Sequence, residues 1–274
     1  MPPWRLIGLI GFSALTAEAR NPFHVIAFYT GKEDAAHISF VHEANRWFPA
    51  TALERQFTYE STTDWNKLNE AFLNRYQVVV FLDSRPEEAA QRRAFERYMK
   101  HGGAWMGFHF AAFALTPSKV PQNWDWYHDE FLGSGQYRSN TWRPTAAILR
   151  LEDSGHPATQ GLPSTFRSSP NEWYRWEKDL RANPDIRILL SIDPSSFPVG
   201  TGPKPEEIWR NGYYPVVWTN KRYRMIYVNM GHNDMDYEHP AHRELSFTFA
   251  NDLQNQLIVQ SLLWLGDRQG ESAR

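Results

Sequence analysis

The sequence predicts an α/β fold: a doubly wound, mostly parallel sheet with helices on both faces. Short runs of β-forming residues alternate with longer segments of helical spacing through the first half of the chain. The strongest strand signal, residues 76–82, is a continuous apolar run of the kind buried on both faces of a parallel sheet. A second apolar run follows Gly102-Gly103 and leads into a turn of small residues with His109 at its tip.

The elements of the first half follow one another in strict alternation. Residues 24–29 are β-formers closed by Thr30-Gly31, and residues 35–48 carry apolar side chains at helical spacing. A strand at 57–60 and a helix at 66–74 come next, before the strand at 76–82. The helix at 89–101 starts near Pro86 and stops at the glycine pair, which then opens the strand that ends at His109.

The second half is less regular. Residues 116–142 mix prolines, glycines and aromatics, which indicates a long surface excursion that belongs to the domain. Four later strands are predicted at 146–151, 186–191, 214–218 and 224–229, and a closing helix at 252–265. With no repeat, heptad series or low-complexity tract, residues 24–266 are expected to form a single domain.

Composition excludes several functions. Lysine and arginine (29) are balanced by aspartate and glutamate (31), so no basic excess predicts a nucleic-acid partner. The chain has no cysteine, which excludes disulfides, thiolate metal ligands and cysteine nucleophiles. Aromatic residues make up 15% of the chain and suit either an ordinary core or a sugar-binding cleft.

Residues 1–19 resemble a signal peptide. A basic residue, an apolar stretch and a small-x-small site ending at Ala19 follow in the expected order, which predicts a periplasmic or secreted protein. The stretch is too short to span a bilayer as a stable helix, so no membrane span is predicted. A buried N-terminal segment of a cytoplasmic protein is the alternative.

Three residues are candidate catalytic groups: His109, Glu172 and His232. His109 and His232 follow strands, at the sheet edge where ligands bind in open α/β folds. An imidazole there can transfer protons near neutral pH, and a carboxylate among aromatics, as at Glu172, suits general acid or base work. The alternatives are a buried histidine satisfied by the backbone and a carboxylate paired with an arginine.

Other side chains are expected to line the site. The candidate substrate-binding residues are His156, Trp126, Tyr127, Tyr174 and Asn233. Together with Trp124 and Trp142, the aromatics at 126 and 127 are predicted to form a wall for a pyranose ring or, alternatively, a small core within their loop. His156 alternatively caps a turn. His109, His156 and His232 are also candidate ligands of a divalent metal such as zinc, although their spacing matches no zinc motif.

Four ordered segments resemble the trehalose-utilisation (ThuA-like) family. They are the turn at His109, the pair Trp126-Tyr127 with Leu132-Gly133, residues 155–163 with 171–174, and residues 215–218 leading to 229–232. The resemblance implies a flavodoxin-like sheet related to class I glutamine amidotransferases. Those relatives present a cysteine at the turn, where this chain has His109, so a cysteine-dependent amidotransferase is excluded. An Asp-Glu pair is expected before the tyrosine, but the chain has Asn171-Glu172.

The resemblance implies a sugar-processing enzyme that acts on a disaccharide, glycoside or keto-sugar, as a hydrolase, lyase or isomerase. Its partner is then a small carbohydrate, and a homo-oligomer stays open. A non-catalytic carbohydrate-binding protein on the same scaffold is the alternative, because fold alone does not imply function. We expect His109, His156, Glu172 and His232 to lie along one rim of the sheet.

Overall fold

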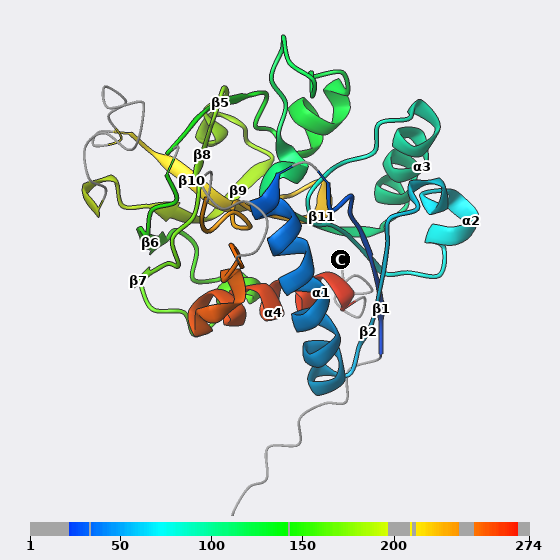
Figure 1. Cartoon of the computed structure of the whole chain (residues 1–274), viewed down its shortest axis with the longest axis horizontal. Helices are drawn as coiled ribbons and strands as arrows, with labels where there is room; N and C mark the ends of the chain where they lie inside the picture. Colours follow the sequence, from blue (N-terminus) through cyan, green and yellow to red (C-terminus); the bar gives the residue numbers. More distant parts are fainter. Residues whose placement is uncertain are drawn as a thin grey trace, which may run out of the picture.

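Five parallel strands form one half of a nine-stranded sheet in the computed structural model, which describes residues 22–32, 34–141, 143–196, 209, 212–235 and 244–267 (Figure 1). In spatial order they are β2 (Thr58–Thr62), β1 (His24–Phe28), β3 (Val78–Phe81), β4 (Ala104–Phe108) and β11 (Tyr223–Val228). This is the strand order of flavodoxin-like sheets. The signal-peptide prediction for 1–19 lies outside the described residues.

An extension built from antiparallel pairs completes the sheet beyond β11. Its strands are β10 (Tyr214–Asn220), β9 (Ile186–Ile192), β6 (Ile148–Leu151) and β7 (Thr165–Arg167), each antiparallel to its neighbour. Only β10 and β6 therefore run against the direction of the other described strands of this sheet. The predicted mostly parallel sheet is confirmed.

Alternation along the parallel strands divides the interior into two cores. On β1, Val25 and Ala27 face one core while Ile26 and Phe28 face the other. The first core is covered by α1 (Ala35–Arg55) and α4 (Asp252–Gly266), and the second by α2 (Glu70–Leu73) and α3 (Ala89–Lys100) (Figure 1). Helices on both faces confirm the doubly wound α/β prediction.

Two helices differ from their predicted bounds. The segment expected as one helix at 66–74 is divided into η1 (Trp65–Lys67) and α2, because the Asn69 side chain accepts the Phe72 N–H and starts a new helix. Helix α1 continues past Pro49 to Arg55. Burial of Phe48 and Ala52 on the core face offsets the helical hydrogen bond lost at the proline.

Short elements fill the predicted surface excursion. A π-helical segment, η3 (Trp126–Phe131), is followed by β5 (Tyr137–Asn140), which pairs with β8 (Tyr174–Trp176) in a separate two-stranded sheet. The sequence analysis missed β5, β7 and β8, since three or four residues are too few to show an alternating pattern. The remaining short helices are η2 (His109–Ala112), η4 (Pro157–Thr159), η5 (Leu180–Ala182), η6 (Pro194–Ser196) and η7 (Thr248–Ala250). None of the helices in the described ranges has the length and apolarity needed to cross a membrane.

Candidate active site

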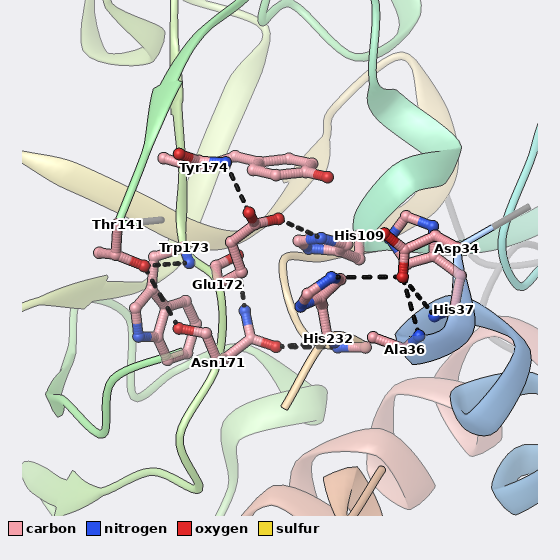
Figure 2. Close-up of polar contacts among 12 residues, drawn as sticks. Asp34, Ala36, His37, His109, Thr141, Asn171, Glu172, Trp173, Tyr174 and His232 are labelled. Atoms are coloured by element: carbon pink, nitrogen blue, oxygen red, sulfur yellow. Dashed lines mark hydrogen bonds and ion pairs between the residues drawn. The ribbon is translucent and has the colours of Figure 1, made fainter. Parts of the chain in front are cut away.

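Three loops at the carboxyl ends of parallel strands bring a group of polar side chains together (Figure 2). The β1–α1 connection and the first turn of α1 supply Asp34 and His37. His109 directly follows β4, and the segment after β11 supplies His232. Because parallel strands end at the same edge of a sheet, residues far apart in the chain meet here. Glu172 approaches from the connection between β7 and β8.

His109 is held in a strained and buried position. Its φ of 37° lies in the left-handed region, which a non-glycine residue occupies at a cost of about 1–3 kcal/mol. The Tyr227 hydroxyl donates to the His109 carbonyl oxygen at 2.8 Å and helps to fix this conformation. The imidazole packs against the ring of Tyr174, with centroids 4.0 Å apart. A backbone strained in this way is typical of functional sites.

Glu172 lies beside His109, with its Oε2 atom 3.4 Å from the histidine Nε2. The other carboxylate oxygen, Oε1, accepts a hydrogen bond of 2.6 Å from the Asn140 side-chain amide. The Glu172 backbone N–H donates to the His232 carbonyl oxygen at 2.8 Å. Both the side chain and the backbone of this buried glutamate are therefore fixed.

Asp34 and His232 form a second acid and imidazole pair. The Asp34 Oδ1 lies 3.6 Å from Nε2 of His232 and also accepts the Ala36 N–H at 2.8 Å, which caps helix α1. His232 is buried, whereas the Asp34 side chain is 51% exposed. The group is thus accessible to solvent on its Asp34 side.

His37 completes the group from the first turn of α1. Its ring centroid lies 5.1 Å from that of His232 and 5.4 Å from that of His109. The ring is buried, and its Nε2 has no hydrogen-bond partner among the described residues. An unpaired polar atom of this kind costs free energy unless a ligand satisfies it.

The pKa values of the three imidazoles differ. Burial and, to a smaller extent, the neighbouring His232 lower the pKa of His37 to about 3. Burial likewise lowers the pKa of His109 well below its ordinary value, so both rings are neutral at pH 7. For His232, burial alone would lower the pKa, but the hydrogen bond to Asp34 and the charge of Glu172 outweigh it and the pKa is raised. The pKa of Asp34 is lowered in turn: burial raises it, but the hydrogen bond to His232 and the nearby imidazole charges outweigh that effect.

Asn171 explains the departure from an Asp-Glu pair. Its Oδ1 accepts the N–H groups of Gly231 and His232 at 3.0 and 3.1 Å. Its Nδ2 donates to the carbonyl oxygens of Asn229 and Glu172 at 2.7 and 3.1 Å. An aspartate cannot make the last two bonds, because a carboxylate has no donor. Asn171 is therefore a positioning residue that joins the Glu172 segment to the loop after β11.

Of the other candidates, Tyr174 reaches this group and His156 does not. The predicted common rim is correct for His109, Glu172 and His232, but His156 packs its ring against Trp264 of α4, with centroids 4.6 Å apart. Its Nδ1 accepts the Ala158 N–H at 3.1 Å and starts η4. The turn-capping alternative thus describes His156, whose Nδ1 lone pair is already used.

The proposed aromatic wall forms a small core. Tyr127 is fully buried, donates its hydroxyl proton to the Ala111 carbonyl oxygen at 2.9 Å and stacks on Trp124. Trp126 packs on Phe131, and its Nε1 donates to the Tyr223 hydroxyl at 3.2 Å. These rings serve packing, because η3 turns them toward the second core. Trp142 lies outside the described residues.

Asn233 has a structural place beside the site. Its Oδ1 accepts hydrogen bonds from the Ser246 and Thr248 hydroxyls and from the Phe247 N–H. Its Nδ2 donates to the Pro170 carbonyl oxygen at 2.8 Å. With its amide engaged on both sides, Asn233 ties the segment after β11 to η7, and the geometry gives no support to the predicted substrate contact.

Sequence reasoning missed Asp34, His37 and Asn140. Asp34 directly precedes a predicted helix that follows the first strand, and His37 is one turn further on. That position alone could have assigned both to the carboxyl edge of the sheet. Asn140 carried no comparable signal, because it belongs to the short strand β5, whose pairing is not visible in the sequence.

Comparison with known proteins agrees with this fold. The family model ThuA, described as trehalose utilisation, matches residues 25–248. A protein from Bacteroides uniformis described as ThuA-like is 34% identical, with a TM-score of 0.77 over 93% of this chain and 95% of its own. A second, from Parabacteroides merdae, is 16% identical, with a TM-score of 0.61 over 93% and 92% of the two chains.

More distant structures share the fold alone. The α-L-fucosidase isoenzyme 2 of Paenibacillus thiaminolyticus is 13% identical, with a TM-score of 0.52 over 91% of this chain and 34% of its own. None of the curated proteins is significantly similar in sequence. The family match covers most of the chain, and the Bacteroides uniformis relative covers nearly all of it. The chain therefore belongs to the ThuA, or trehalose utilisation, family.

Proposed function

We propose that this chain is a sugar-processing enzyme that acts on a disaccharide, glycoside or keto-sugar by proton transfer through His109 and Glu172. One observation carries the proposal: a buried imidazole with a depressed pKa lies 3.4 Å from a buried carboxylate. The family description, trehalose utilisation, supports a sugar-related role. General acid or base catalysis needs such a group in a fixed orientation within reach of the substrate.

In this proposal neutral His109 accepts a proton from the substrate. The Glu172 carboxylate beside it stabilises the imidazolium that forms, as a carboxylate does in other imidazole-based sites. Asn140 and the Glu172 backbone bond keep the carboxylate in place. The proton then returns to a different atom of the sugar, which is the requirement for isomerisation, elimination or release of a glycosidic oxygen.

The other members of the group supply charge and shape. His232 is the imidazole of the set whose pKa is raised, and its ring centroid lies 5.5 Å from that of His109. When His232 carries a proton, its positive charge stabilises an oxyanion that develops on the sugar during proton transfer. Burial and the charge of Glu172 raise the pKa of Tyr174 well above its ordinary value, so its phenol stays protonated and gives the His109 ring a flat neighbour.

The rival function, a non-catalytic carbohydrate-binding protein, has less support. It predicts aromatic and hydrogen-bonding side chains that contact a sugar, but Trp124 and Tyr127 are buried in the second core. A binding module also has no need for a strained histidine with a depressed pKa beside a carboxylate.

Incubation with a panel of disaccharides, glycosides and keto-sugars, followed by product analysis, tests the enzyme proposal. We expect wild-type protein to consume a member of the panel and His109→Gln to lower turnover by about 10²- to 10⁴-fold. His101→Gln is the matched control, because that exposed histidine follows α3 at the opposite end of β4. Full turnover by His109→Gln, or no consumption of any sugar while one of them binds, would overturn the proposal.

A further inference from the structure

Asp34, His37 and His232 form a compact set of metal-ligating groups. Each offers one ligand atom, and these atoms all lie within 4.8 Å of one another. Asp34 and His37 come from the start of α1 and His232 from the loop after β11, so two separate segments of the chain converge on one point (Figure 2).

The distances between these ligand atoms are close to those found around a bound zinc ion. Zinc–nitrogen and zinc–oxygen bonds of about 2.0–2.2 Å in a tetrahedral site place neighbouring ligand atoms roughly 3.3–3.5 Å apart. The Asp34 Oδ1 and His232 Nε2 atoms are already 3.6 Å apart. A small side-chain movement of His37 brings the third ligand into range, since all three atoms already lie within 4.8 Å.

An unsatisfied nitrogen is the independent observation. The buried Nε2 of His37 has no hydrogen-bond partner among the described residues. A buried polar atom without a partner is unfavourable, because its hydrogen bond to water is lost and not replaced. The structure therefore keeps a buried imidazole nitrogen of His37 without a partner, next to a second imidazole and a carboxylate.

We propose that Asp34, His37 and His232 bind one divalent transition-metal ion of the zinc class. Two imidazoles and one carboxylate suit zinc and its neighbours better than magnesium or calcium, which prefer oxygen ligands. Three protein ligands leave a position for water or substrate, as in catalytic zinc sites. If the proposed function holds, this open position is where a sugar oxygen binds beside His109. The ion then takes the place of a protonated His232 as the positive charge, because a metal-bound imidazole is neutral.

The ligand set differs from the one predicted from sequence. Of His109, His156 and His232, only His232 is retained. His109 faces Glu172 and Tyr174, and His156 is engaged in capping η4. His109 is thus expected next to the ion without binding it.

Titration of the metal-free full-length protein with Zn²⁺ by calorimetry, and with Co²⁺ by visible absorption, tests the site. We expect one ion per chain and a raised melting temperature, because a ligand that binds only the native state stabilises it. Asp34→Asn should weaken binding by at least about 100-fold, more than the loss of a group that only supports a ligand. Asparagine is a good helix N-cap, so this variant keeps α1 capped.

Matched histidine variants locate the site. His37→Gln and His232→Gln should lose the ion, whereas His109→Gln and His156→Gln should bind it as tightly as wild type does. Unchanged binding by Asp34→Asn would overturn the assignment, as would loss of the ion in His109→Gln. Failure of wild-type protein to bind Zn²⁺, Co²⁺ or Mn²⁺ would also overturn it.

Different experimental results would contradict the metal-site proposal and the enzyme proposal. If wild type binds the ion, Asp34→Asn does not, and neither consumes any sugar, the metal site stands and the enzyme proposal falls. If rigorously metal-free protein turns over a sugar and binds no ion, the enzyme proposal stands and the metal site falls. Binding is read by calorimetry and absorption, so neither result depends on knowing the substrate.

Discussion

The side chain of Asn171 fixes the backbone at His232, whose N–H it accepts at 3.1 Å. The same amide donates through Nδ2 to the Asn229 carbonyl oxygen at 2.7 Å. A single buried side chain thus spans the segment that carries Glu172 and the loop that carries His232. Together with the bond from the Glu172 N–H to the His232 carbonyl oxygen, this amide sets the relative position of the two functional groups.

Asn171→Asp should destabilise the protein and disorganise the site. The carboxylate loses both donor bonds and places a charge against the carbonyl oxygens of Asn229 and Glu172. An uncompensated buried charge costs about 3–5 kcal/mol, which chemical denaturation measures as a loss in the free energy of unfolding. Asn183→Asp is the control, because a carboxylate there still accepts the Asp185 N–H. Equal stabilities of the two variants would contradict the positioning role of Asn171.

Gly231→Ala should displace His109. The φ of Gly231 is 135°, which L side chains rarely adopt, and a methyl group there would lie 3.3 Å from the Cβ of His109. We expect a loss of about 1–3 kcal/mol in the free energy of unfolding and a fall in turnover. Gly155→Ala meets only ordinary contacts and should change neither. A Gly231→Ala variant as stable and active as wild type would show that this close approach is unimportant.

Stability should fall in acid partly because of His156. Burial lowers the pKa of His156 to about 4 from an ordinary 6.5, so between these values the unfolded chain binds a proton that the folded chain rejects. The free energy of unfolding therefore decreases as the pH falls through this window and is unaffected above it. Asparagine can keep the cap of η4 without titrating. Denaturation of His156→Asn across the window should show a shallower pH dependence than wild type, and an identical slope would refute the assignment.

Activity should persist in mildly acidic solution. A base whose pKa is lowered loses its reactive neutral form only when the pH falls through that lowered value, and the pKa of His109 is well below 6.5. The acid limb of kcat/KM against pH should therefore lie below the ordinary histidine range. An acid limb centred near 6.5 would show that His109 is not the proton acceptor.

Residues 1–19 should be absent from protein isolated from its native host. The order of a basic residue, an apolar stretch and a small-x-small site predicts cleavage after Ala19. Amino-terminal sequencing is the measurement. A chain that begins at Met1 would exclude cleavage and favour the cytoplasmic alternative.

Long apolar runs made the central strands predictable. β3 and β4 are buried on both faces, so their sequences carry an unbroken signal, and the strands at β1, β9, β10 and β11 were also found. β5, β7 and β8 were not, because they are three or four residues long and only partly buried, so their sequences contain no continuous apolar run. The fold class therefore followed from local pattern, but the antiparallel extension was only partly visible.

The site residues that could be predicted are those whose location in the fold follows from their position in the chain. His109 and His232 follow strands of the parallel half, and topology brings them together. The sequence does not reveal which hydrogen bonds each polar side chain makes. Asn233 and His156 accept hydrogen bonds from backbone N–H groups of the protein itself. His37 was missed because a histidine on a largely buried helix is expected to be an ordinary core residue.

The residues of the candidate site come from two different parts of the fold. Asp34, His109 and His232 follow strands of the parallel half, and His37 lies in the first turn of α1. In contrast, Glu172, Asn140 and Tyr174 come from the β5–β8 ribbon and the segment that leads into it. Substitutions in the ribbon and in the segment that leads into it can change the carboxylate and the ring beside His109 while the histidines themselves are unchanged. A protein of this architecture can thus acquire a different acid, and with it a different reaction, on an unchanged set of imidazoles.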